Sequence, residues 1–435
     1  MKRDTVEVGI IGLGTVGKGT VKVLLGNRDI LRERIGFDMN LRKIADLDII
    51  KDRGIELPHG ILTTNAEEIL HDPDIDIVVE LIGGIHPAKE YVLTAVRNGK
   101  HVVTANKALL AVEGTEIFGE AEREGVEIGF EASVGGGIPI IKILREGLVA
   151  NRILNIYGII NGTSNYILSR MTEEGIEFTD ALKEAQRLGY AEADPTFDIE
   201  GIDSAHKLTI LASLAYNIPF AYSEVYKEGI SKITPQDIEF ALELGYKIKL
   251  LAIAKAGNSA VELRVHPTMV PKDNLISKVE SVFNAIYVEG DAVGEALFYG
   301  KGAGDMPTGS AIVSDIVDIA RNIRRNSGRR APVLKTQSSP LRIKGMEEVV
   351  CMYYFRFSAM DSPGVLSKIA GILGDNNISI ASVIQKGRRV GGAVPLVVLT
   401  HMAKERNVME AIKSIDTLPI VAEKTHFIRV EGKGE

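Results

Sequence analysis

Short apolar runs alternate with segments of helical periodicity in the first third of the chain. The apolar runs predict buried strands at Val6–Ile11, Leu41–Ala45, Ile75–Ile82, His101–Thr104 and Val126–Phe130. The helical patterns between them lie at Lys18–Leu25, Pro87–Arg97 and Gly114–Arg123. Strands separated by helices imply right-handed crossovers, and therefore a parallel sheet that is covered on both faces. We therefore expect an α/β, Rossmann-type doubly wound domain over residues 1–135, completed by a returning helix at about 305–325.

The middle of the chain has a different pattern. The predicted elements are a strand at Arg152–Ile160, helices at Ser164–Glu173, Thr179–Leu188 and Ile202–Ala215, and alternating runs at Tyr246–Lys255, Ala260–Val265 and Asn284–Glu289. Period-two alternation indicates strands with one packed face and one face free for helices or a partner subunit. We expect an α+β domain over residues 136–304, followed by a helix at Pro307–Ile323 that returns to the first domain.

A third segment follows a stretch rich in Arg, Asn, Ser, Gly and Pro, which predicts a linker over residues 324–348. Beyond it the patterns are Val349–Phe357, Pro363–Leu373, Ile378–Ile384, Val394–Thr400, Glu405–Ile415 and Ile420–Arg429. They read strand, helix, strand, strand, helix, strand, which is the βαββαβ order of a ferredoxin-like domain, here over residues 349–432.

Composition and charge narrow the class of protein. The chain has 435 residues, 45% of them hydrophobic, and a net charge of -7. It has no basic stretch that could follow a phosphate backbone and no apolar run of the ~20 residues that span a bilayer, so we expect neither a nucleic-acid partner nor a membrane. The chain enters a strand pattern at once, so we expect no signal peptide. The single cysteine, Cys351, cannot form an internal disulfide. These features predict a cytoplasmic globular protein.

Three glycines follow the first strand directly and precede the first helix. Gly12, Gly14 and Gly17 form G-x-G-x-x-G. In this pattern the first glycine permits a tight turn, the second lets backbone amides approach a pyrophosphate, and the third lets the helix pack closely on the strand. The amino terminus of the helix then faces the phosphates with unpaired N–H groups. The sequence therefore predicts a dinucleotide site.

The residues after the second strand leave the choice of dinucleotide open. Asp46 or Asp48 stands where a carboxylate would hold the adenosine 2′-hydroxyl, which favours NAD. Lys51 and Arg53 follow closely enough to bind the 2′-phosphate of NADP instead. We predict a slight preference for NAD.

The stretch from Leu188 to Leu208 carries the strongest chemical signal. Asp203 and Lys207 are four residues apart and share one face of a helix. Such a pair also stabilises exposed helices, but this helix continues with apolar residues on nearly every side, so its charged first turns should face a cleft. A lysine ammonium can give a proton to a carbonyl oxygen during reduction, and Asp203 could orient it. Glu192 could pair with the ammonium of an amino-acid substrate.

Two further motifs lie at predicted strand ends. Lys107, in Thr-Ala-Asn-Lys, follows a strand of the parallel sheet, at the edge where such sheets bind ligands. It could equally be an ordinary loop lysine. The loop Glu131–Ile138 contains three successive glycines, which expose backbone groups to a ligand or cation or else form a flexible hinge between domains.

Together these motifs, with Asn161-Gly-Thr-Ser-Asn-Tyr-Ile-Leu168 and Gly302-Ala-Gly304, resemble the homoserine dehydrogenase family over residues 8 to about 320. The carboxyl-terminal segment resembles an ACT domain through Asp361-Ser-Pro-Gly-Val-Leu366 and Asn376-Asn-Ile-Ser. The resemblance implies an NAD(P)-dependent oxidoreductase that interconverts L-homoserine and L-aspartate 4-semialdehyde in threonine and methionine biosynthesis. It also implies a homodimer or a higher homo-oligomer, with the dimer interface formed through the sheet of the middle domain.

The resemblance also assigns roles to residues. It implies that Lys207 is the catalytic proton donor, Asp203 its neighbour in substrate binding and catalysis, Glu192 a contact of L-homoserine, and Lys107 a lysine near both substrate and nicotinamide. The implied cofactor residues are Gly12, Leu13, Gly14, Thr15, Val16, Gly17, Lys107 and Gly304. The implied sodium ligands, mostly backbone oxygens, belong to Glu131, Val134, Gly136 and Ile138.

Three questions follow from the resemblance: the choice of dinucleotide, the role of the ACT domain and an alternative function. Many family members carry an arginine after the second strand for the NADP phosphate, and Leu47 stands at the nearest position here, which puts strict NADP use in doubt. An ACT domain implies an amino-acid effector, for which L-threonine is our hypothesis, although the module could serve only in dimerisation. An amino-acid-sensing protein on an inactive scaffold is the alternative function. It predicts losses among Glu192, Asp203, Lys207 or the first glycines, and none of these residues is lost.

Overall fold

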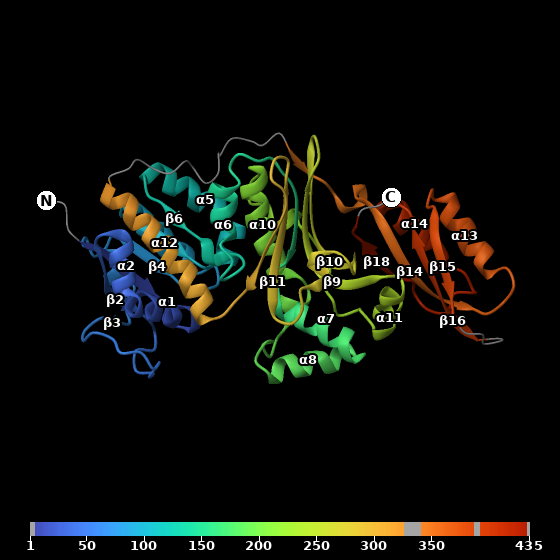
Figure 1. The fold of residues 1–435 in the computed structure, drawn as a ribbon, viewed down its shortest axis with the longest axis horizontal. Helices are drawn as coiled ribbons and strands as arrows, with labels where there is room; N and C mark the ends of the chain where they lie inside the picture. Colours follow the sequence, from blue (N-terminus) through green and yellow to red (C-terminus); the bar gives the residue numbers. More distant parts are fainter. Residues whose placement is uncertain (1–4, 326–340, 387–391, 433–435) are drawn as a thin grey trace. The chain divides into compact units, whose positions relative to one another are not determined.

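The computed structural model describes residues 5–325, 341–386 and 392–432 (Figure 1). The chain forms two compact units that do not follow sequence order. The first contains the chain up to Gly162, Asp203–Val225 and the segment that begins at Phe283. The second contains Thr163–Ile202, Tyr226–Val282 and the segment that begins at Arg342.

A six-stranded parallel sheet organises the amino-terminal part of the first unit. Its order is β3-β2-β1-β4-β5-β6, and every pairing is parallel. The strands are β1 Thr5–Ile11, β2 Asp38–Ala45, β3 Leu62–Thr63, β4 Ile77–Glu80, β5 His101–Thr104 and β6 Ile128–Gly129. This is the strand order of a doubly wound dinucleotide fold, in which the order reverses between β1 and β4. The predicted fold class is confirmed.

Helices cover this sheet (Figure 1). They are α1 Thr15–Gly26, α2 Arg28–Ile35, α3 Glu67–Leu70, α4 Ala88–Arg97, α5 Lys107–Glu124 and α12 Asp305–Arg325. The returning helix α12 packs so closely on α1 that a Cβ at Gly19 would lie 2.0 Å from the Asp305 carbonyl oxygen. The pattern did not predict α2, because this helix buries no residue and therefore has no apolar stripe.

The first unit also contains a smaller antiparallel sheet. Strand β11, Phe283–Gly290, pairs with β7, Ile153–Ile159, on one side and with β12, Gly294–Lys301, on the other. The pattern predicted β7 and β11 but not β12, whose residues are nearly all partly or fully exposed. Helix α10, Ile202–Tyr216, is buried along almost its whole length, as its apolar composition indicated.

The second unit combines helices of the middle segment with a larger sheet. The helices are α7 Gly162–Glu174, α8 Phe178–Arg187, α9 Thr196–Ile199 and α11 Pro235–Glu243. The long hairpin of β9, Tyr246–Ala256, and β10, Ala260–Pro271, is antiparallel. The expectation of one free face is wrong for this hairpin, because successive residues of both strands are buried. Helix α11, which the pattern did not predict, contacts β9.

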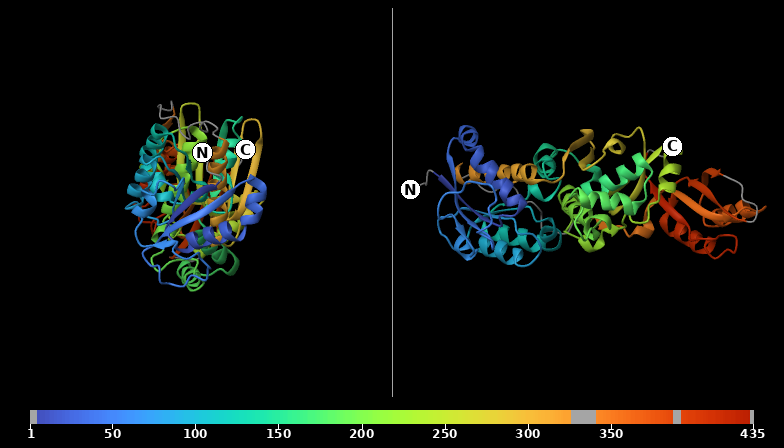
Figure 2. Two further views of the ribbon diagram at one scale, coloured as in Figure 1. Left: turned by 90° about the vertical axis from the view of Figure 1, so that its left-hand side faces the viewer. Right: turned by 90° about the horizontal axis from the view of Figure 1, so that it is seen from below.

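The carboxyl-terminal segment has the predicted βαββαβ order. Its elements are β14 Val350–Met360, α13 Val365–Asp375, β15 Ile380–Gln385, β16 Ala393–Thr400, α14 Glu405–Ile415 and β18 His426–Val430. Apolar residues of α13 and α14 share one core with β14, so both helices lie on the same face of the sheet (Figure 2). The last strand begins at His426 rather than at Ile420. The predicted linker lies largely outside the described residues, although β13, Arg342–Ile343, pairs with β10.

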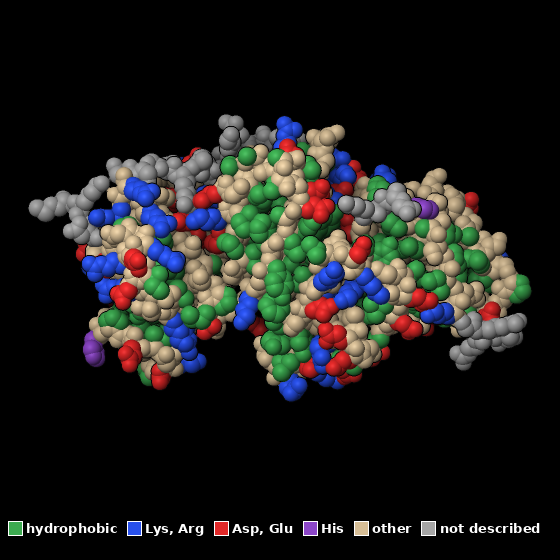
Figure 3. Space-filling model, in the orientation of Figure 1, with side chains coloured by type: hydrophobic (Ala, Val, Ile, Leu, Met, Phe, Trp, Pro, Cys, Tyr) green, Lys and Arg blue, Asp and Glu red, His purple; other side chains and the backbone are tan. Residues whose placement is uncertain are grey.

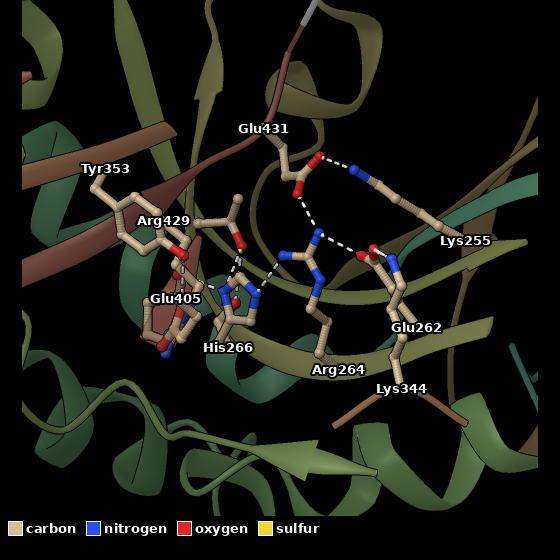
Figure 4. A network of polar contacts seen from close by, with 11 residues as sticks. Lys255, Glu262, Arg264, His266, Lys344, Tyr353, Glu405, Arg429 and Glu431 are labelled. Carbon is tan, nitrogen blue, oxygen red and sulfur yellow. Dashed lines mark hydrogen bonds and ion pairs between the residues drawn. The ribbon is translucent and has the colours of Figure 1, made fainter. Parts of the chain in front are cut away.

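Strand β18 also extends the sheet of the middle segment. It pairs with β14 on one side and, in parallel, with β10 on the other, where Thr268 lies opposite Arg429. A buried ionic network surrounds this junction (Figure 4). Arg264, 1% exposed, lies 2.5 Å from a Glu431 oxygen, and Arg429 lies 2.5 Å from an oxygen of Glu405. Buried ion pairs gain little net stability after desolvation, but separating the partners is costly, so the network holds the register of β18 on β10.

Candidate active site

The three glycines after β1 have the local geometry of a phosphate-binding turn. Gly12 has φ +103°, and a Cβ there would lie 2.8 Å from the Leu81 backbone. A Cβ at Gly17 would lie 2.2 Å from the Gly12 carbonyl oxygen, so helix and turn meet without a side chain between them. Around Gly14 no described atom comes within 4 Å of the Cβ position, and no acidic residue stands in the first turn of α1. A pyrophosphate can therefore approach the free amides that begin at Thr15.

The carboxylate after β2 is held beside this turn. Asp46 accepts a hydrogen bond of 2.6 Å from the Leu13 amide, and its other oxygen lies 2.8 Å from the Arg53 guanidinium. Arg53 also donates to the Leu13 carbonyl oxygen at 2.7 Å. Asp48 is exposed and accepts from the amides of the turn that follows, including that of Lys51. The two acidic candidates are thereby distinguished, because only Asp46 contacts the glycine turn.

Two lysine side chains and one asparagine side chain of the first unit meet around Asp203. The Lys207 ammonium donates to Asp203 Oδ2 and to the Ile160 carbonyl oxygen, each at 2.6 Å. Lys107 Nζ lies 3.1 Å from Asp203 Oδ1, and the Asn161 amide donates to Oδ2 at 2.9 Å. Asp203 and Lys207 are 3% and 8% exposed, whereas the Lys107 side chain is 35% exposed. The cluster is thus open on the side of Lys107.

The electrostatics of the cluster keep the carboxylate ionised. Burial by itself would raise the pKa of the Asp203 carboxyl, but the charges of Lys207 and Lys107 and the hydrogen bonds to the carboxylate outweigh it. The pKa therefore lies well below its usual range. An ionised Asp203 orients the Lys207 ammonium and stabilises its charge away from bulk water.

Each of these side chains stands at the end of a secondary-structure element. Lys107 opens α5 immediately after β5, and the Asn106 side chain caps that helix by accepting from the Leu109 amide at 3.1 Å. Asn106 also donates to the Gly84 carbonyl oxygen at 2.6 Å, which ties the start of α5 to the loop after β4. Ile160 and Asn161 follow β7, and Asp203 and Lys207 occupy the first turns of α10.

Two other predicted site residues, Gly304 and Glu192, belong to other segments of the chain. Gly304 immediately precedes α12, with φ +124°, and α12 packs on the nucleotide helix α1. Glu192 belongs to the second compact unit, in the exposed loop after α8, where the Gln186 side chain donates to its backbone oxygen at 3.1 Å. Its role as a substrate contact stays a prediction.

In the glycine loop at 131–138, the carboxylate of Glu131 is buried and accepts hydrogen bonds from backbone amides. The Glu131 side chain accepts hydrogen bonds of 2.8 Å from the amides of Ile141 and Lys142, at the start of the short helix α6, Ile140–Lys142. Burial raises the pKa of Glu131 to about 7, although these bonds oppose it. The Glu131 amide donates to Asp315 at 2.7 Å, and burial raises the pKa of Asp315 to about 8. Each oxygen of the Glu131 carboxylate thus already accepts a backbone amide.

Comparisons with known proteins cover nearly the whole chain. The family model "Homoserine dehydrogenase, NAD binding domain" matches residues 12–131, "Homoserine dehydrogenase" matches 139–317 and "ACT domain" matches 353–417. A homoserine dehydrogenase of Neisseria gonorrhoeae is 49% identical, with 98% of each chain covered. The chain belongs to the homoserine dehydrogenase family. It is therefore an oxidoreductase with a nicotinamide-dinucleotide domain and an ACT domain.

Solved homoserine dehydrogenases have the same fold. That of Thiobacillus denitrificans is 51% identical, with a TM-score of 0.93 and 98% of each chain covered. A hyperthermophilic archaeal homoserine dehydrogenase in complex with NADPH is 28% identical, with a TM-score of 0.62, and covers 72% of this chain and 97% of its own.

Sequence reasoning missed two buried polar residues of the first unit. Asn161 was noted only as part of a motif, and it lies directly after the buried strand β7. We also overlooked Glu80, which is fully buried at the end of β4 and accepts from the Thr104 hydroxyl at 2.7 Å. Burial raises the pKa of Glu80.

Proposed function

We propose that the cluster of Lys107, Asp203 and Lys207 carries out the proton chemistry by which this enzyme interconverts L-homoserine and L-aspartate 4-semialdehyde. The observation that carries the proposal is the buried Lys207 ammonium, held at 2.6 Å by both Asp203 and the Ile160 carbonyl oxygen. The product, L-homoserine, would serve threonine and methionine biosynthesis.

Reduction of an aldehyde to an alcohol adds a hydride at carbon and a proton at oxygen. The bound nicotinamide supplies or accepts the hydride. Lys207 donates the proton to the developing alkoxide, and in the oxidative direction the neutral amine takes it back. Asp203 holds the ammonium in place, and Lys107 adds positive charge where negative charge develops. Glu192 pairs with the ammonium of the amino-acid substrate, since that charge needs a partner once it leaves water.

The cofactor residues we propose are those of the glycine turn and its surroundings. They are Gly12, Leu13, Gly14, Thr15, Val16, Gly17, Lys107 and Gly304. The free amides at the start of α1 support this assignment. Asp46 is positioned for the adenosine ribose, and Arg53, which pairs with it, can turn to a 2′-phosphate. We propose that the enzyme accepts both NAD and NADP, with a slight preference for NAD.

We further propose that the backbone oxygens of Glu131, Val134, Gly136 and Ile138 hold a sodium ion. The loop fits such an ion, because among the described residues no hydrogen bond reaches the carbonyl oxygens of Val134 or Gly136. Both residues are buried. Neutral carbonyl oxygens without donors are suitable ligands for a monovalent cation.

A homodimer through the sheet of β7, β11 and β12 is supported by the apolar character of its exposed face. Tyr157 packs edge-on against Tyr287, and Phe283 stacks on Tyr299, which is 56% exposed. Figure 3 shows hydrophobic side chains gathered over β11. Contiguous exposed apolar surface of this kind marks protein interfaces.

We propose amino-acid regulation through the ACT domain, with L-threonine as the ligand. A cavity of about 470 Å³ lies beside the turn before α13, lined by residues 359–366, Gln385, Val394 and Leu396. Because β18 pairs with β10, ligand binding here can bias the sheet of the middle segment. A ligand can inhibit only if it binds two states differently, with coupling of ~1–3 kcal/mol. The module could otherwise serve only in dimerisation.

The decisive experiment measures homoserine-dependent reduction of NAD and of NADP side by side with the full-length enzyme. We expect turnover with both cofactors. 2-Aminobutyrate, which lacks the hydroxyl group, is the control and should give no reduction. Absence of homoserine-dependent turnover, together with threonine binding by calorimetry, would instead support the amino-acid-sensing alternative.

A further inference from the structure

The side chain of Asn284, on β11, is a buried amide without a partner. The residue is 1% exposed, and among the described residues no hydrogen-bonding partner lies within reach of its Oδ1 atom. An unpaired buried polar group costs about 1–3 kcal/mol, so native proteins rarely retain one without a bound water, ion or ligand.

The Asn284 amide lies next to the glycine loop. A Cβ at Gly302 would fall 1.9 Å from Asn284 Nδ2, so the amide packs directly on the Gly302 backbone. On the other side, a Cβ at Gly136, which has φ +56°, would lie 2.5 Å from the Gly302 carbonyl group. The Gly137 amide donates to the Lys301 carbonyl oxygen at 3.0 Å, which fastens the loop to the end of β12.

The next side chain on the same face of β11 confirms this placement. Ile286, two residues beyond Asn284, lies 3.5 Å from the Cβ position of Gly135. Since alternate residues of a strand share one face, Asn284 and Ile286 both point toward the loop. Asn284 is the polar member of the pair.

The kind of ligand that would bind here can be inferred from the polar atoms around Asn284. The loop offers buried carbonyl oxygens of Val134 and Gly136 that accept no hydrogen bond among the described residues, and Asn284 adds an amide oxygen. These three groups are all acceptors. A water molecule can donate to two of them at most, whereas a cation can bind all three at once. The Glu131 carboxylate is occupied by two amides, and a site of neutral oxygens suits a monovalent cation better than a divalent one.

We propose that Asn284 Oδ1 is the side-chain ligand of a sodium ion held by the glycine loop. The inference rests on the sodium site proposed above and assigns to it a residue from a strand far along the chain. The ion then joins β11 to the loop that follows the nucleotide domain, and its binding stabilises the folded chain by mass action.

The test measures the thermal midpoint of the full-length protein in NaCl and in choline chloride at equal ionic strength. Wild type should melt about 2–4 °C higher in NaCl. Asn284→Leu should lose this increment. In choline chloride it should melt no lower than wild type, because leucine fills the same space without an unpaired amide. Sodium-23 line broadening by the protein should be weaker with Asn284→Leu.

Two further variants make the result specific. Asn284→Asp places a carboxylate at the site, so its midpoint should depend on sodium more strongly than that of wild type. Asn155→Leu is the matched control, because Asn155 lies on the neighbouring strand β7 and already donates to Glu289 at 2.6 Å. This control should keep the wild-type increment even if it melts lower.

The outcomes separate the two proposals. If wild type shows no difference between NaCl and choline chloride and no sodium-23 broadening, the sodium site itself is refuted, and the role of Asn284 with it. If wild type shows the increment and Asn284→Leu keeps it, the loop binds sodium without Asn284, and only the inference drawn here is overturned. Neither result bears on turnover of homoserine.

Discussion

Lys207→Met tests the central chemical assignment. The substitution keeps a long apolar side chain but deletes the ammonium, and with it the 2.6 Å contacts to Asp203 and Ile160. Loss of a general acid typically costs ~10²–10⁴ in rate, which corresponds to about 3–5 kcal/mol of barrier. We therefore expect kcat to fall by that factor. The dissociation constant of the cofactor should change little, because Lys207 donates to Asp203 and Ile160, whereas the phosphates are expected at the glycine turn after β1.

The same substitution also perturbs stability, and the structure indicates by how much. Removing one partner of a buried ion pair can cost about 3–5 kcal/mol. Here Asp203 retains Lys107 at 3.1 Å and Asn161 at 2.9 Å, so the cost should be smaller. The double variant Lys207→Met/Asp203→Asn removes both charges of the pair, and should recover stability without recovering activity.

The assay combines steady-state turnover, cofactor titration by fluorescence and the thermal midpoint. Lys249→Met is a matched control, because Lys249 is also buried and donates to a backbone oxygen, that of Val279, at 2.6 Å. It should lower the thermal midpoint and leave kcat close to wild type. If Lys207→Met turns over homoserine within tenfold of wild type, Lys207 is not the proton donor.

The other predictions concern the substrate, the pH dependence of stability and the cofactor. Glu192→Ala should raise the KM for homoserine at least tenfold more than that for the cofactor; equal effects would mean a structural role. Asp315 has a folded-state pKa raised to about 8, so its stabilising contribution is lost as the pH rises through that value. The unfolding free energy of wild type should therefore fall between about pH 6 and 8, and in Asp315→Asn this fall should be about 2 kcal/mol smaller. If the fall is the same in the variant, Asp315 is not its source. Asp46→Ala should weaken NAD binding more than NADP binding in parallel titrations, and Arg53→Leu should do the reverse. If either variant weakens the binding of both cofactors equally, Asp46 and Arg53 only stabilise the glycine turn and do not distinguish the two cofactors.

The sequence by itself determined the local architecture. The apolar run before Gly12, the glycine spacing and the helix after it predicted a nucleotide turn, because each feature depends on neighbouring residues. The same holds for the βαββαβ order of the carboxyl-terminal segment and for the burial of α10. Elements without a clear apolar pattern were missed for a physical reason: α2 buries no side chain, and β12 is largely exposed.

The tertiary structure alone decided which distant residues meet. Lys107, Asn161 and Asp203 come from three separate elements, and the carboxylate of Asp46 was distinguished from that of Asp48 only by its contact with the glycine turn. Likewise, nothing in the period of β11 shows that Asn284 packs on Gly302, or in that of β18 that it pairs with β10. Sequence periodicity reports which face of an element is buried. It does not report what covers that face, because the contacts that answer the question join residues far apart in the chain and depend on the packing of the whole unit.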